Sequence, residues 1–355
     1  MHVPDTVRTL HVSLGLRMIG CAPNLPISGF GSHRSTATEQ ATTMTIGVIF
    51  PGQGSQSVGM LATLADEFPE VRSCYEEASA VLGYDLWAVV QAGPEEKLNQ
   101  TAITQPALLA AGVAVWRVWQ GENGPAARVM AGHSLGEYTA LVCADAIDFA
   151  DAVRIVARRG ELMQQAVPAG EGAMAAILGL EDAQVAEACT AAAQGQVVEA
   201  VNFNSPGQVV IAGHRAAVER AIEAANALRA KKAIILPVSV PSHCALMAPA
   251  AEQLAEVLQT VTIRAPKVPV IHNVDARPHS DPQAIRSALV QQLHRPVRWV
   301  EVIRAMTADG LALFVEPGPG KVLSGLGKRI ERDASFLPVF DPESLNKALH
   351  SALEI

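Results

Sequence analysis

The sequence predicts an α/β protein with two parts, a main domain built on a parallel sheet and a smaller subdomain inserted into it. Two continuous apolar runs, Ile46–Phe50 and Val129–Ala131, have the composition of strands buried on both faces. A β-α-β-β-α-β pattern then interrupts the alternation of strands and helices. The predicted parts are a leader, 1–43, the main domain, 44–169 plus 241–355, and the subdomain, 170–240.

The composition is that of a globular chain with a sizeable core. Hydrophobic residues make up 49% of the 355 residues and charged residues 17%. The net charge of −8 gives no general attraction to nucleic acid or to an anionic membrane, so we expect neither as a partner. The five cysteines form no C-x-x-C pair, which indicates reduced thiols in the cytoplasm and no metal site.

Residues 1–43 differ from the rest of the chain. They carry more arginine than acidic residues and are rich in Ser, Thr, Gly and Pro towards their end. None of their apolar runs is long enough for a transmembrane helix. We expect a disordered leader, or a working start at Met44, because a core strand begins directly after it. Import into an organelle through this segment is the weaker alternative.

The first strand ends in a turn-rich loop, Pro51–Gln56. The loop fails the G-x-G-x-x-G pattern, since Ser57 stands in its last position, and no P-loop lysine follows. We therefore expect it to bring the backbone of Gln53 to the carboxyl edge of the sheet, where open α/β folds bind ligands.

Helices follow this loop. The predicted ones cover 60–92, then 107–119 with Pro106 in its first turn, and then a segment to Gln165 capped by Asp148 or Asp151.

Residues 128–140 contain the pattern on which the functional prediction depends. Gly132-His-Ser134-Leu-Gly136 fits G-x-S-x-G, with a strand before it and a helix from Glu137 onward. Strand, sharp turn and helix together form a nucleophile elbow, which predicts an α/β-hydrolase-like main domain. Ser134 would stand at the apex, and the N–H of Leu135 would face an oxyanion. The pattern alone leaves a Gly-rich turn with an incidental serine as an equal alternative.

The inserted segment, 170–240, predicts a ferredoxin-like subdomain. Its strands are expected at 173–178, 197–203, 209–212 and 233–240, its helices at 181–194 and 216–230, and a tight turn at Asn204–Gly207.

The main domain then resumes. We expect a helix to Thr260, a strand over 269–273, a helix over 282–293, a loop over 292–299 into a further helix, and a strand over 312–315 that ends in a forced turn.

A serine nucleophile needs a general base, because its hydroxyl is barely ionised at neutral pH. Of the ten histidines, His243 is the first candidate, because it follows the inserted segment at the predicted sheet edge, and His272 is the second. His133 adjoins the nucleophile and should point elsewhere. Since no aspartate stands out as the third member, a backbone carbonyl could orient the imidazole.

Seven motifs together resemble one family, the malonyl-CoA:acyl-carrier-protein transacylases of type II fatty-acid synthesis. The resemblance covers about 44–350. The motifs, in chain order, are Phe50–Gln56, Gly132–Tyr138, Arg159-Gly160, Asn202–Gln208, Val240–Met247, Asn273–Asp275 and Glu316–Lys321.

The resemblance implies a role for individual residues. Ser134 matches the acylated serine and His243 the base. Arg159 matches the arginine that pairs with the malonyl carboxylate. An arginine pair on a helix is otherwise expected at the solvated surface, so the resemblance reverses that expectation for Arg159. For Arg158 we still expect a solvated surface position. The backbone N–H groups of Gln53 and Leu135 match the oxyanion hole.

Two glutamines have implied roles as well. Gln105 matches a pocket-lining residue, and Gln292 matches the position whose backbone carbonyl orients the histidine. The implied substrates are malonyl-CoA and holo acyl carrier protein, the reaction needs no cofactor, and we expect a monomer.

Carrier proteins are acidic, so docking on this acidic chain would need a local basic patch. Lys231, Lys232, Lys328 and Arg329 are the candidates, and solvated helix ends are an equal explanation for them.

Three alternatives stay open. They are a serine esterase or thioesterase, a malonyl transferase of a polyketide or malonate-decarboxylase pathway, and a non-catalytic carrier-binding protein.

Overall fold

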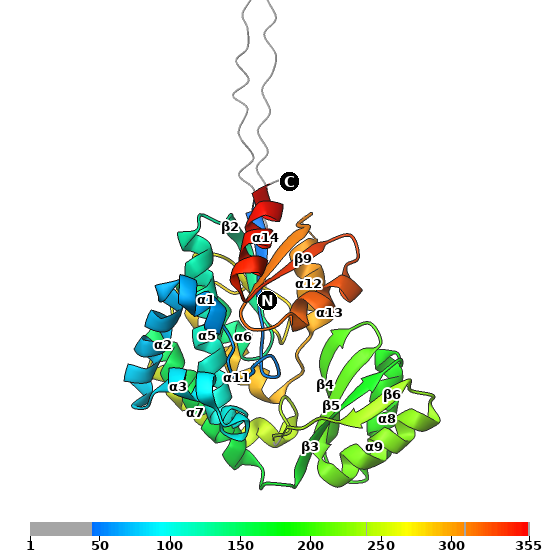
Figure 1. The fold of residues 1–355 in the computed structure, drawn as a ribbon. Helices are drawn as coiled ribbons and strands as arrows, with labels where there is room; N and C mark the ends of the chain where they lie inside the picture. Colours follow the sequence, from blue (N-terminus) through cyan, green and yellow to red (C-terminus); the bar gives the residue numbers. More distant parts are fainter. Residues whose placement is uncertain (1–44, 239, 309, 354–355) are drawn as a thin grey trace, which may run out of the picture. The chain divides into compact units, whose positions relative to one another are not determined.

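A computed structural model describes residues 45–238, 240–308 and 310–353 (Figure 1). The prediction for the leader falls outside these ranges. All the described residues belong to one compact unit. The division into a main domain and a subdomain stays a prediction, although the unit contains two separate sheets.

The main sheet has five parallel strands in the order β7-β2-β1-β8-β9. Side chains of β1 alternate between two cores: Val48 and Phe50 enter one, and Ile49 enters the other. Burial on both faces explains why the strand is an unbroken apolar run. The strands are β1 Thr45–Phe50, β2 Ala126–Gly132, β7 Val270–Ile271, β8 Leu313–Pro317 and β9 Ser335–Val339.

Helices cover both faces of the main sheet. The core that contains Phe50 packs against α1 Ala62–Glu67, α2 Pro69–Leu82, α3 Leu86–Ala92, α4 Glu95–Leu98, α5 Thr101–Gly121, α6 Gly136–Cys143, α7 Phe149–Ala166, α10 Ala248–Gln259, α11 Pro282–His294 and α14 Pro342–Leu353. The core on the opposite face packs against α12 Trp299–Thr307 and α13 Val322–Ile330. Within the described ranges, no helix has the length and apolar character to cross a membrane.

The second sheet is antiparallel, with the order β4-β5-β3-β6. With two helices on it, this is the ferredoxin-like arrangement that the sequence predicts. Its elements are β3 Gly172–Leu178, α8 Asp182–Ala193, β4 Val198–Ser205, β5 Gln208–His214, α9 Arg215–Ala227 and β6 Lys232–Ile235.

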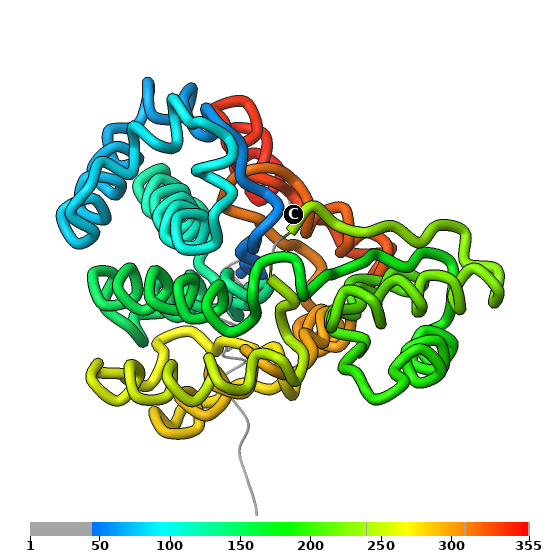
Figure 2. The backbone as a smooth tube through the Cα atoms, turned by 90° about the horizontal axis from the view of Figure 1, so that it is seen from below, coloured from blue at the N-terminus to red at the C-terminus, as the bar shows by residue number. Residues whose placement is uncertain are grey.

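Strand β4 joins the small sheet to the segment between α11 and α12. The N–H of Phe203 donates to the carbonyl of Val297, and the N–H of Val297 donates to the carbonyl of Val201. Figure 2 shows the green segment that contains β4 beside the orange segment that leads into α12. This junction fixes one side of the small sheet against the end of α11.

Several predicted boundaries are wrong. Helix α5 begins at Thr101, so Pro106 lies inside it, because packing of α7 against Ala102 extends the helix beyond what its apolar pattern indicates. Strand β6 ends at Ile235, two residues before Pro237, which has no N–H for a ladder bond. The predicted strand 269–273 is only the two-residue β7.

Four other details differ from the prediction. The turn predicted at Asn204–Gly207 narrows to Pro206-Gly207, since β4 runs to Ser205. Gln292 lies on α11 and not in a loop. Strand β9 is absent from the prediction. Asp148 stands at the start of α7, but its carboxylate binds Arg264 instead of capping the helix.

Gly160 allows α7 to pack closely against α5. This close packing helps to bury the neighbouring residue, Arg159. A Cβ at position 160 would lie 2.6 Å from the Cα of Ala102 and 2.7 Å from the carbonyl oxygen of Thr101. Because both atoms belong to backbone, Gly160→Ala is expected to lower the free energy of unfolding by about 1–3 kcal/mol, measured by chemical denaturation.

Gly325→Ala is the matched control for this prediction. Gly325 is also helical, but its added Cβ would meet nothing within 4 Å. That substitution should raise the free energy of unfolding by about 0.5–1 kcal/mol, the difference in helix propensity. Equal effects of the two substitutions would contradict the close approach of α5 and α7.

Candidate active site

A sharp turn between β2 and α6 exposes Ser134. The Ser134 backbone is left-handed, with a φ of 52°, a conformation that favours glycine and is strained for other residues. A Cβ on Gly132 would lie 1.9 Å from the carbonyl carbon of Gly136, and one on Gly136 would lie 2.1 Å from the carbonyl oxygen of Phe50. Both positions therefore require glycine, and the predicted nucleophile elbow is confirmed as a backbone geometry.

His243 meets the serine directly. Its Nε2 lies 2.8 Å from the Oγ of Ser134, and its Nδ1 lies 2.7 Å from the backbone carbonyl oxygen of Gln292. A carbonyl oxygen only accepts hydrogen bonds, so Nδ1 carries the proton and Nε2 is free to accept one from the serine. His272, the second candidate for the base, lies instead against Glu137, at 2.7 Å.

The surroundings of His243 keep its imidazole neutral. Burial, followed by the positive charge of Arg159, lowers the pKa of His243 from 6.5 to about 3. A neutral imidazole is the form that accepts a proton, so the pair is ready to act as nucleophile and base at neutral pH.

Arg159 is buried beside the pair, with 1% of its surface exposed. Its Nη1 donates to the Oε1 of Gln105 at 2.9 Å, and its Nη2 donates to the Oγ of Ser134 at 3.2 Å and to the Oε1 of Gln292 at 3.0 Å. In the described ranges no acidic side chain pairs directly with it. Burial lowers the pKa of Arg159, an effect that Tyr138 and Glu137 oppose.

A buried guanidinium without a carboxylate partner indicates an anionic ligand, because such a charge is costly unless it is paired. Arg158, one position earlier, is partly buried, with 42% of its side chain exposed, and it pairs with Glu161 at 2.9 Å, as expected for a residue on the solvated face of the helix.

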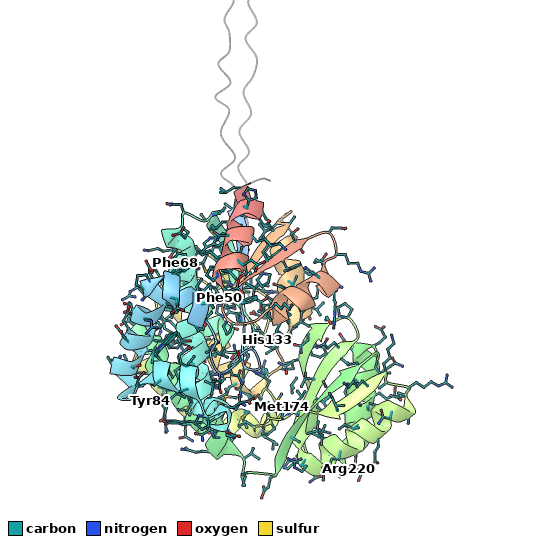
Figure 3. All side chains as sticks on the ribbon, in the orientation of Figure 1. Phe50, Phe68, Tyr84, His133, Met174 and Arg220 are labelled. Atoms are coloured by element: carbon teal, nitrogen blue, oxygen red, sulfur yellow. The ribbon has the colours of Figure 1, made fainter. Side chains whose placement is uncertain are left out.

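A pocket of about 180 Å³ opens over these residues. Its walls come from both parts of the chain. The main domain contributes Gln53, His133, Ser134, Leu135, Arg159, Met163 and His243, and the other side contributes Met174, Asn202, Asn204, Val210, Leu236 and Val238. Figure 3 shows His133 and Met174 on the facing sides of the two parts.

Sequence reasoning missed this second wall. Asn202 and Asn204 belong to the motif Asn202–Gln208, whose composition predicts a tight turn from Asn204 and no part of a pocket wall. In the structure, the Oδ1 of Asn204 accepts a hydrogen bond from the Nε2 of His133 at 2.8 Å. This contact ties the small sheet to the residue before the nucleophile, and it directs the His133 ring away from Ser134, as expected.

A buried polar cluster behind the pocket was also missed. It consists of Glu137, His272, Asn273 and the side-chain amide of Gln292, all fully buried. Glu137 stands three residues after Ser134 in the G-x-S-x-G-E segment, and this spacing indicates a residue near the nucleophile but not the partners that it binds. Among the described residues, no group of three or more His, Cys, Asp and Glu could hold a metal ion.

The four basic candidates for carrier docking are exposed. Lys231 and Lys232 stand at the start of β6, not at a helix end, and Lys328 and Arg329 occupy the last turn of α13. Lys231 and Arg329 line one shallow pocket, in which Arg329 donates to the Oε1 of Gln208 at 2.6 Å. One residue of each pair therefore lies on the same surface, whereas Lys328 lines a separate pocket.

Comparison with known proteins decides the family. The acyl transferase domain model matches residues 48–335. The malonyl CoA-acyl carrier protein transacylase of Escherichia coli K12 is 59% identical over 301 residues, which are 85% of this chain and 97% of that protein. The chain belongs to the malonyl-CoA:acyl-carrier-protein transacylase family.

Other relatives agree with this assignment. The Bacillus subtilis member is 45% identical over 311 residues, which are 87% of this chain and 98% of that protein. An acyl carrier protein S-malonyltransferase structure from Vibrio cholerae is 58% identical, has a TM-score of 0.84, and covers 85% of this chain and 99% of its own. A malonyl-transacylase bound to a type II PKS acyl-carrier protein is 57% identical, with a TM-score of 0.85, and covers 86% and 99%.

The pKa of His243 sets the pH below which Ser134 loses its reactivity, that is, the acid limb of the pH–rate profile. A base acts only above its pKa, so lowering the pKa from 6.5 to about 3 moves the loss of reactivity to lower pH. The rate at which a neutral fluorophosphonate labels Ser134 should therefore change little between about pH 7 and pH 5. Arg159→Ala should move the limb upward, and an apparent pKa near 6.5 in the unaltered protein would refute the burial argument.

Proposed function

We propose that this family member transfers the malonyl group of malonyl-CoA to the phosphopantetheine thiol of acyl carrier protein through a malonyl-serine intermediate, and thereby supplies fatty-acid synthesis. One observation carries the proposal. The Ser134–His243 pair shares its pocket with Arg159, a buried cation that has no acidic partner among the residues that the structure describes. An acyl group that ends in a carboxylate would supply that partner.

In the first half-reaction, the malonyl carboxylate binds Arg159, and a planar guanidinium can hold it with two parallel hydrogen bonds. The Oγ of Ser134 attacks the thioester carbonyl while the Nε2 of His243 takes the hydroxyl proton. The tetrahedral intermediate collapses, the C–S bond breaks, and the CoA thiolate leaves with the proton from His243. The product is a malonyl ester of Ser134.

In the second half-reaction, the thiol of the carrier protein takes the place of CoA. His243 accepts its proton as the thiolate attacks the ester carbonyl, and the proton returns to the Ser134 oxygen when the ester bond breaks. The two halves use one site in alternation, so the kinetics are ping-pong. The backbone carbonyl of Gln292 keeps His243 in the correct tautomer throughout.

Backbone N–H groups of Gln53 and Leu135 would hold the oxyanion in both halves. Both residues line the pocket with Ser134. The N–H of Ser134 is not available for this, because the Oδ1 of Asn273 accepts it at 2.7 Å. Loss of one donor from such a site costs roughly 3 kcal/mol of transition-state stabilisation. Gln105 holds Arg159 at the pocket wall.

The proposed reaction uses no metal ion and no redox cofactor, and the proposed enzyme is a monomer that acts in the cytoplasm. A serine esterase is the weaker candidate, because water would have to compete with a thiol at a site in which Arg159 selects a diacid. A polyketide pathway is supported by one observation, the similarity to a transacylase that binds a type II PKS carrier protein.

Intact-protein mass after brief incubation with malonyl-CoA or acetyl-CoA tests the proposal. The unaltered protein should gain one malonyl group, Ser134→Ala should gain none, and Arg159→Ala should lose malonyl while it gains acetyl. Arg158→Ala is the matched control, because Arg158 lies on the solvated face of the helix, and it should behave like the unaltered protein. Release of free malonate without any adduct would show a hydrolase.

Carrier docking is the second test. If the surface formed by Lys231, Lys232, Lys328 and Arg329 attracts an acidic carrier, reversing the charge of Lys231 and Lys232 should slow transfer to the carrier about tenfold at low salt. The formation of malonyl-serine should not change. Lys267→Glu, an exposed lysine that pairs with Asp145, is the control. Carrier kinetics that do not change with salt would refute charge steering.

A further inference from the structure

Glu137 is a buried carboxylate that contacts neither the pocket nor the solvent. None of its surface is exposed, and it is not among the residues that line the pocket. It nevertheless receives three hydrogen bonds. The Nδ1 of His272 lies 2.7 Å from its Oε1, and the backbone N–H of Asn273 and the Nε2 of Gln292 donate to its Oε2 at 2.9 and 3.0 Å.

The first branch from Glu137 runs through Asn273 to the nucleophile's backbone. The Oδ1 of Asn273 accepts the N–H of Ser134 at 2.7 Å, and its Nδ2 donates to the carbonyl of Gly132 at 2.8 Å. One amide thus holds the chain on both sides of position 133. Since Ser134 has a strained, left-handed backbone, it persists only where the surroundings enforce that conformation.

The second branch runs through Gln292 to the other two residues of the site. The Nε2 of Gln292 donates to the backbone carbonyl of Ser134 at 2.8 Å, and its Oε1 accepts from Arg159 at 3.0 Å. The backbone carbonyl of the same residue orients His243. An amide side chain can rotate and exchange its oxygen with its nitrogen. The negative charge of Glu137 excludes that exchange, because only the NH₂ group can face a carboxylate.

We infer that Glu137 is a positioning residue for the acyl transfer: through Asn273 and Gln292 it fixes the Ser134 backbone, the Arg159 guanidinium and the His243 carbonyl anchor in one geometry. The inference deepens the proposed function and rests on it for the identity of the acyl donor. The site then consists of two groups of residues. One group contacts the substrate, and the other is fully enclosed and contacts only the residues of the first group.

Substitution of Glu137 separates this role from simple structural support. Glu137→Ala removes both branches and should slow single-turnover acylation by malonyl-CoA about 100-fold, since small misplacements of reacting groups have effects of this size. Glu137→Gln can keep its single oxygen towards Asn273 and Gln292, because a neutral His272 can move its proton to Nε2. This variant should stay within a few-fold of the unaltered protein.

Glu316→Ala is the matched control. Glu316 is the other fully buried glutamate of the described ranges, and it also accepts two backbone N–H groups, those of Leu323 and Ser324 at 2.9 and 2.6 Å. Those bonds hold the start of α13. Its loss should lower the unfolding temperature but leave the acylation rate unchanged, which separates a stability effect from a positioning effect.

Each rate is measured with malonyl-CoA by rapid quench and, independently, with the neutral fluorophosphonate, at a temperature at which circular dichroism shows a folded protein. If only the fluorophosphonate labels the unaltered protein, the proposed donor is wrong, but the labelling rates still test Glu137. Should Glu137→Ala not fold, Asn273→Ala decides, with an expected loss of at least tenfold in labelling. Rates equal to those of the unaltered protein in a folded variant would overturn the inference.

Discussion

The close approach of three backbone segments at the nucleophile elbow is the constraint on which the rest of the structure depends. The end of β1, the turn after β2 and the start of α6 lie so near one another that no side chain fits at Gly132 or Gly136. This contact forces Ser134 into a left-handed backbone. It also points the hydroxyl to the carboxyl edge of a sheet that is buried on both faces.

The central charge of the site is the guanidinium of Arg159, with which no carboxylate of the described residues pairs directly. Arg159 is buried at the wall of the pocket, and its hydrogen bonds go to two amides and to the nucleophile. The nearest negative charge, on Glu137, acts through Gln292 and does not neutralise the guanidinium directly. In the proposed function, the carboxylate of the substrate supplies the negative charge that these contacts of Arg159 lack. The same cation helps to keep His243 neutral, so selectivity and reactivity share one residue.

The small sheet supplies the second wall of the pocket around Ser134. Without it, the Ser134 pocket would be open on the side where Met174, Asn202, Asn204 and Val238 now stand. The bond between His133 and Asn204 and the ladder between β4 and Val297 attach this wall at two places. Walls on two sides of Ser134 limit the access of water to the nucleophile.

The sequence alone predicted the class of fold and the elbow from local patterns, and its resemblance to a known family pointed to Ser134, His243 and Arg159, which the structure brings into one pocket. The tertiary structure decided what lies at long range. The apolar pattern misplaced the start of α5, since packing against Gly160 sets it, and it gave no sign of Glu137 as a hub. The residues that donate hydrogen bonds to Glu137 are separated from it by at least 135 positions along the chain. Spacing along a chain cannot specify such contacts, because they form only when separate strand ends and helices pack together.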